Sequence, residues 1–111
     1  MFEKNLQIGY LLDFYGDILP ERKRSVMDMY YNEDLSLAEI AAEIGISRQG
    51  VRDMIKKSEE ELEFYEEKLG LAHKLKQAEE SAKRVAQISS GLELPRDLLE
   101  ELNTLTKIIT D

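Results

Sequence analysis

At 111 residues the chain is long enough for one compact domain with an appended element, and its hydrophobic fraction of 42% is too high for a disordered protein. It contains no cysteine and a single histidine, His73, so we expect no disulfide, no metal site, no cofactor and no enzyme active site. The formal net charge of −8 disfavours binding to nucleic acid unless positive charge is gathered in one place.

The residue pattern predicts helices throughout the chain and no strand. A first helix is expected over about residues 4–16, because five apolar residues there recur at spacings of three and four. They are Leu6, Tyr10, Leu11, Phe14 and Tyr15. Pro20 suits the first turn of a second helix, where its missing N–H costs nothing. We expect this second helix to end near residues 32–34.

A third helix should begin after Ser36, because Glu39 three residues later completes a capping box. Gly45 supplies the positive φ that ends this helix, and Ser47 caps a fourth helix. Nothing interrupts the fourth helix before Gly70, so we expect a length of about 22 residues. Its expected inner residues are Val51, Met54, Ile55, Ser58, Leu62, Tyr65 and Leu69.

Two further helices are expected after Gly70, over about residues 71–89 and from Pro95 onward. Their apolar stripes exceed what one small three-helix core needs as cover. The stripes comprise Leu75, Ala78, Ala82, Val85, Ile88, Leu98, Leu102, Leu105, Ile108 and Ile109. We therefore divide the chain into a domain of residues 1–70 and a helical extension of residues 71–111. We expect the extension to pair with a second copy in a homo-oligomer, with folding back within one chain as the alternative.

Residues 36–58 meet the requirements of a helix-turn-helix, in which two helices cross closely around a tight turn. Ala41 is the small residue needed at the crossing, and Gly45 supplies the turn. Apolar residues that would hold the helices together are Ile40, Ile44, Ile46, Val51 and Met54. This stretch carries four basic and three acidic side chains, whereas residues 1–35, 59–80 and 81–111 are each net negative.

The start of the second helix of such a motif faces base edges in the DNA major groove. The candidate nucleic-acid-binding residues are Ser47, Arg48, Gln49, Arg52, Lys56 and Lys57, with Arg22 and Lys23 of the preceding helix. Arginine pairs with guanine, glutamine pairs with adenine and lysine reaches phosphates. Gly50 would keep the surface low enough for close approach. The alternative is a packing module with solvated basic side chains, because Asp53 and the acidic run at residues 59–67 would repel phosphates.

Several segments carry a resemblance to known proteins. The segments Leu19–Arg24, Met29–Tyr31, Leu35–Ala41 and Gly45–Arg48 are similar to region 4 of bacterial sigma factors, which binds promoter DNA. A second set is closer still to the YlxM family of helix-turn-helix proteins, over about residues 5–77. It comprises Leu12–Tyr15, Met29–Tyr31, Asp34–Leu37, Ser47–Gln49 and Tyr65–Leu69.

The resemblance implies an all-α, sigma region 4-like fold of the winged-helix-like DNA-binding superfamily, here with a long acidic helix and a C-terminal helical extension. It also implies a role in the signal recognition particle pathway, because genes of the family lie beside the gene for a protein of that particle. We therefore expect a DNA-binding regulator, with RNA as a less favoured ligand. The alternative is an accessory protein that binds the RNA or protein component of the signal recognition particle.

The sequence also bears on location. No apolar run approaches the roughly 20 residues that span a bilayer. The first five residues lack the basic and apolar segments of an export signal. We therefore expect a cytoplasmic protein that does not insert into membranes.

Overall fold

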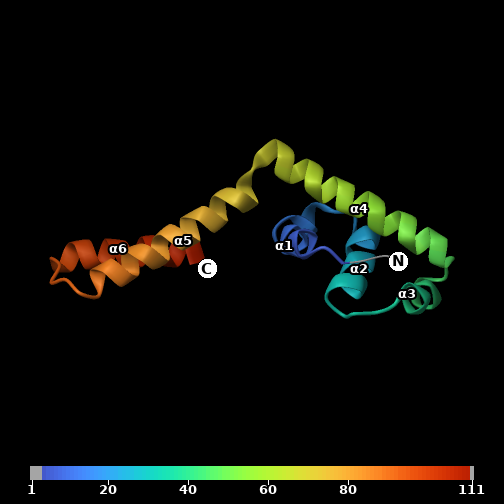
Figure 1. The fold of residues 1–111 in the computed structure, drawn as a ribbon, viewed down its shortest axis with the longest axis horizontal. Coiled ribbons are helices and arrows are strands. Elements are labelled where there is room, and N and C mark those ends of the chain that lie inside the picture. The colour runs from blue at the N-terminus through green and yellow to red at the C-terminus, as the bar shows by residue number, and fades with distance from the viewer. Residues whose placement is uncertain (1–3, 111) are drawn as a thin grey trace. The chain divides into compact units, whose positions relative to one another are not determined.

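The computed structural model describes residues 4–110, and every regular element in that range is a helix (Figure 1). The elements are α1 (Leu6–Tyr15), the short 3-10 helix η1 (Gly16–Ile18), α2 (Glu21–Tyr31), α3 (Leu37–Ile44), α4 (Arg48–Leu69), α5 (Leu71–Ser89) and α6 (Arg96–Thr110). They form two compact units that divide after Gly70. None of the described helices is long and apolar enough to cross a membrane. The predicted all-α fold class is confirmed.

The first unit is built around α4, against which α1, α2 and α3 all pack (Figure 1). The buried residues of α4 recur at spacings of three and four along one line of the helix: Val51, Ile55, Ser58 and Leu62. The buried residues of the other three helices are Ile8, Leu11, Leu12, Tyr15, Val26, Met27, Tyr30, Ile40 and Ala41. The Ser58 hydroxyl donates to the Met54 carbonyl at 2.8 Å, so the one polar side chain in this line is hydrogen-bonded.

Three details of this unit differ from the prediction. Pro20 precedes α2 as its N-cap, with a ψ of 143°, and does not lie in the first helical turn. Leu6 is exposed, because the buried line of α1 passes through Ile8 and Leu12 instead. Leu69 is 54% exposed, since it lies in the last turn of α4, beyond the residues that α1 covers.

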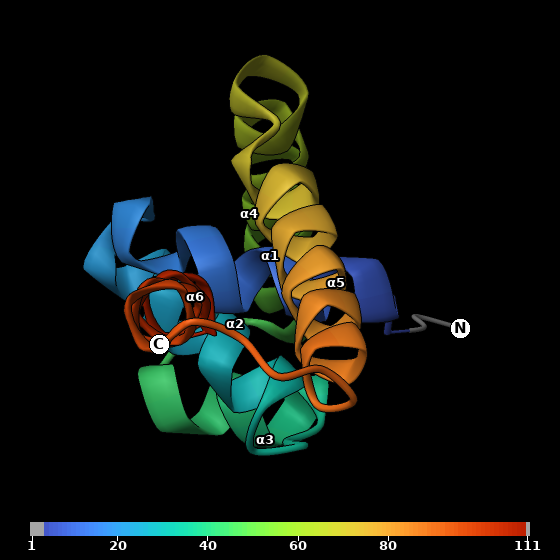
Figure 2. The same ribbon diagram turned by 90° about the vertical axis from the view of Figure 1, so that its left-hand side faces the viewer.

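The second unit is a hairpin of α5 and α6 joined by residues 90–95, and the two helices pack on each other. Figure 2 shows α6 nearly end-on while α5 runs across the view, so the helices cross at an angle. No residue of α6 is buried. This hairpin therefore has far less core than the first unit.

Candidate nucleic-acid interface

The helix-turn-helix of α3 and α4 is shaped by two N-caps and one left-handed glycine. The Ser36 hydroxyl accepts the Glu39 N–H at 3.0 Å, and the Glu39 carboxylate accepts the Ser36 N–H at 3.0 Å. This second hydrogen bond lowers the pKa of Glu39 from its ordinary value. Gly45 has a φ of 77° and ends α3, and the Ser47 hydroxyl accepts the Gly50 N–H at 3.0 Å to cap α4. The predicted capping box and turn are confirmed.

Gly50 faces the turn between the two helices. A Cβ atom at this position would lie 3.2 Å from the Ser47 Oγ and 3.3 Å from the Ile46 Cδ1. The small residue therefore leaves room for the cap of α4 and for the apolar contact of Ile46. We expected the missing side chain of Gly50 to allow a ligand to approach the exposed surface of α4. This expectation is wrong, because the Cβ position points toward Ser47 and Ile46.

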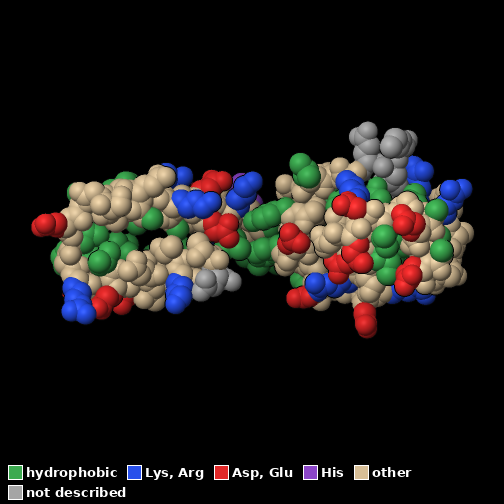
Figure 3. Space-filling view, turned by 90° about the horizontal axis from the view of Figure 1, so that it is seen from below, with side chains coloured by type: hydrophobic (Ala, Val, Ile, Leu, Met, Phe, Trp, Pro, Cys, Tyr) green, Lys and Arg blue, Asp and Glu red, His purple; other side chains and the backbone are tan. Residues whose placement is uncertain are grey.

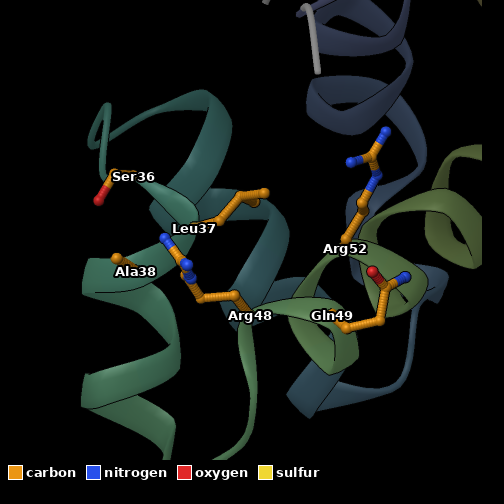
Figure 4. Close-up of a pocket in the computed structure, with 6 residues that line it drawn as sticks. All are labelled: Ser36, Leu37, Ala38, Arg48, Gln49 and Arg52. Carbon is orange, nitrogen blue, oxygen red and sulfur yellow. The ribbon is translucent and has the colours of Figure 1, made fainter. Parts of the chain in front are cut away.

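An open groove of about 490 Å³ lies between the first turns of α3 and α4 (Figure 4). Its lining residues are Ser36, Leu37, Ala38, Arg48, Gln49 and Arg52. Figure 4 shows Arg48 extending toward the start of α3, while Gln49 and Arg52 extend from elsewhere on the first two turns of α4. All three of these α4 side chains are exposed. The structure thus gathers three predicted site residues around one depression, and Ser47 caps the helix that carries them.

Gln49 is oriented by a neighbour on its own helix. Its Nε2 donates to the Asp53 Oδ1 at 2.9 Å, one turn further along α4. A glutamine amide has a second N–H and a carbonyl oxygen, which this hydrogen bond does not use. Asp53 thus lies beside the basic surface formed by Arg48 and Arg52, and part of its hydrogen-bonding capacity is taken by Gln49.

The two predicted lysines of α4 lie on different sides of the helix. With 3.6 residues per turn, Lys56 is displaced by only about 40° from Arg52, whereas Lys57 is displaced by about 140°. Both side chains are exposed. The structure therefore aligns Lys56 with the groove and turns Lys57 away from it.

The two predicted basic residues of α2 do not line this groove. Lys23 forms an ion pair with Glu61 of α4 in a half-buried position. Arg22 is exposed and lines a separate depression formed by α2 and the end of α3. The sequence could not reveal the Lys23 ion pair, because its partner lies 38 positions away.

The acidic run of α4 divides into two sets. Tyr31 donates its hydroxyl to Glu59, Tyr15 donates to Glu66 at 2.8 Å, and Glu61 is the partner of Lys23. Burial raises the pKa of Glu59, although the hydrogen bond from Tyr31 opposes this effect. These inward roles were missed in the sequence. The spacing of seven between Glu59 and Glu66 is the one pattern that indicates a shared helix face.

The second set is exposed and consists of Glu60, Glu63 and Glu67, which we call the acidic line. Spacings of three and four place these residues on one side of α4. The exposed surface of this helix therefore changes from basic near its start to acidic near its end. Within residues 4–110, no group of histidine, aspartate and glutamate side chains is arranged to hold a metal ion.

Comparison with known proteins identifies the family. The sequence model described as "UPF0122: Putative helix-turn-helix protein, YlxM / p13 like" matches residues 2–104. The chain belongs to this family. A UPF0122 protein of Bacillus velezensis is 40% identical over 106 residues, which is 96% of each chain. UPF0122 proteins of Bacillus cereus strain AH187 and Bacillus anthracis are each 46% identical over 90 residues, covering 81% of this chain and 82% of theirs.

The family assignment confirms the resemblance inferred from the motifs and extends it. The motifs ended near residue 77, whereas the family match continues to residue 104, within α6. The α5–α6 hairpin is therefore part of the UPF0122 sequence pattern and not a segment peculiar to this chain.

Proposed function

We propose that this protein is a DNA-binding regulator whose reading surface is the first part of α4. The observation that carries the proposal is the exposure of Arg48, Gln49 and Arg52 around one groove of the helix-turn-helix. In proteins with this motif, the start of the second helix enters the major groove. DNA is preferred to RNA because B-DNA admits an α-helix there, whereas the major groove of A-form RNA is deep and narrow.

Each side chain of this surface suits a different contact. The guanidinium groups of Arg48 and Arg52 match the two acceptors of guanine, and Gln49 retains one donor and one acceptor for adenine. Lys56 extends the same face toward a phosphate. Arg22 would contact the backbone only if the duplex also reaches α2.

The net charge of −8 does not prevent such binding at physiological salt. Glu60 begins the acidic line eight residues after Arg52, which is a rise of about 12 Å along the helix. The Debye length is about 8 Å at physiological ionic strength, so this repulsion is substantially screened at the groove. Asp53 lies closer, and we expect it to limit affinity for phosphates.

The test is a selection from random duplexes at low salt, followed by affinity measurements on the selected sequence. Arg48→Ala and Arg52→Ala should each weaken binding by about 10- to 100-fold, because a bidentate base contact contributes about 1–3 kcal/mol. Lys57→Ala is the matched control, since it removes an exposed basic side chain on another side of α4. Failure to retain any duplex at low salt would refute the proposal.

The acidic line favours a second candidate function, that of an accessory protein of the signal recognition particle. Three exposed carboxylates on one side of α4 suit a basic surface of the particle's protein component. Reversal of Glu60, Glu63 and Glu67 to lysine should abolish a pull-down of that component, while Arg48→Ala leaves it intact. A pull-down that is indifferent to these reversals argues against this function.

A further inference from the structure

The α5–α6 hairpin carries more apolar surface than its two helices cover. Leu98 and Leu99 are 45% and 44% exposed, and Leu105 and Ile108 are 54% and 74% exposed. On α5, Ile88 is 67% exposed. These side chains belong to a regular amphipathic pattern, so a solvent-facing role does not account for them.

An open space between the two helices is itself lined by apolar side chains. Ala78, Ala82 and Val85 line it from α5, and Leu102, Leu105 and Ile109 line it from α6. The space has a volume of about 200 Å³, and Figure 3 shows hydrophobic side chains along it. Because the helices cross at an angle (Figure 2), they do not close this space by themselves.

Most of the exposed apolar residues lie on one face of the hairpin. Leu98 and Leu105 on α6 are rotated by about 40° and 60° from Leu102, and Ile88 on α5 is rotated by about 80° from Ala78 in the same rotational sense. Leu99 is rotated by about 60° from Leu102 in the opposite sense. In an antiparallel pair of right-handed helices, an equal rotation in the same sense leads to the same face. The hairpin therefore presents an apolar face that includes Ile88, Leu98 and Leu105, with Leu99 outside it.

The size of the hairpin indicates that a partner is needed. A unit of about 40 residues rarely folds without disulfides, a metal or oligomerisation. The chain has no cysteine, and no metal-holding group occurs among its described residues. Oligomerisation would supply the cover that the two helices lack.

The charge distribution favours a second copy of this chain as that partner. Residues 71–89 carry four basic and two acidic side chains, and residues 96–110 carry two basic and three acidic side chains. Two hairpins placed with α5 against α6 therefore join helices of opposite net charge, whereas α5 against α5 joins like charges. By contrast, residues 1–70 carry nine basic and sixteen acidic side chains, which disfavours a contact between two copies of that unit.

We propose that the α5–α6 hairpin is a self-association element, in which the apolar face meets that of a second copy with α5 opposite α6. The two hairpins then form a four-helix arrangement with a shared core. This inference concerns another surface than the nucleic-acid interface and holds whether or not the protein binds DNA.

Sedimentation of the full chain at micromolar concentration tests the proposal. We expect twice the mass of the 12.8 kDa chain, and we expect Leu105→Glu to weaken association by at least about tenfold. Ile18→Glu is the matched control, because Ile18 is 55% exposed and lies in the other unit. A wild-type monomer, or a dimer that Leu105→Glu leaves unchanged, would overturn the proposal.

Charge reversal tests the arrangement of the helices. Lys83→Glu with Arg84→Glu makes α5 acidic, and Glu100→Lys with Glu101→Lys makes α6 basic. Each double variant alone should associate more weakly than the wild type, and a mixture of the two should form a mixed dimer. Recovery on mixing cannot arise within one chain, so its absence would overturn the pairing of α5 with α6.

Discussion

The unit of residues 4–70 and the hairpin of residues 71–110 are both helical, yet they use their apolar residues differently. In the first unit the long α4 offers one shared surface to three other helices, and its Ile55 and Leu62 are completely buried. In the hairpin α5 and α6 pack on each other, and α6 has no buried residue. An amphipathic helix therefore becomes part of a core only when enough neighbours cover its apolar face.

Cutting the chain after Gly70 should produce the largest difference between the two units. A fragment of residues 1–70 should unfold cooperatively, because its described core lies within it. A fragment of residues 71–111 should lose most of its helicity on dilution, since isolated short helices are marginal in water. Circular dichroism over a range of concentrations measures both effects, and a hairpin with full helicity at every concentration would contradict this view.

Truncation of a buried and of an exposed leucine should show, within α4 alone, how much burial contributes to stability. Leu62→Ala should lower the free energy of unfolding by about 2–5 kcal/mol, because it opens a cavity at a completely buried position of α4. Leu69→Ala removes the same atoms from the exposed end of α4. This substitution should change the free energy of unfolding by less than about 0.5 kcal/mol. Urea denaturation distinguishes the two variants, and equal losses would show that the end of α4 is also covered.

Loss of the α3 cap should have a smaller effect. Ser36→Ala should cost about 1 kcal/mol, because it removes the acceptor for the Glu39 N–H. Ser25→Ala, at an exposed position in α2, should be neutral or slightly stabilising, since alanine favours helices. Thermal unfolding of both variants tests this. A loss for Ser25→Ala as large as that for Ser36→Ala would argue against a specific capping effect.

The smallest expected effect is on the pH dependence of stability. It should distinguish the partly buried Glu59 from the exposed acidic residues of α4. Burial raises the folded-state pKa of Glu59 above its unfolded value, so proton uptake favours the folded state. The stability of the wild type relative to Glu59→Gln should therefore increase as the pH falls from 7 through that pKa. Glu60→Gln, at an exposed position, should show no such trend in denaturation at several pH values. A parallel trend in both variants would contradict the distinction between inward and outward residues.

The helices were largely predictable because their boundaries follow from local chemistry. The capping box at Ser36, the positive φ at Gly45 and the cap at Ser47 involve neighbours within four residues, and all were identified from sequence. The exposure of Leu6 and Leu69 was not, because burial depends on where other helices end.

The same distinction applies to the candidate site. The motif located Arg48, Gln49 and Arg52, whose grouping depends only on helical geometry and on the adjoining start of α3. The ion pair of Lys23 with Glu61 depends on the packing of α2 on α4, which the sequence did not specify.

Nuclear magnetic resonance of the full chain titrated with a selected duplex tests the nucleic-acid interface most directly. We expect the largest changes in amide chemical shift at residues 36–38 and 48–56, around the groove. We also expect these changes to disappear in the Arg48→Ala/Arg52→Ala double variant. Largest changes along Glu60, Glu63 and Glu67, or no changes at low salt, would contradict the proposed interface.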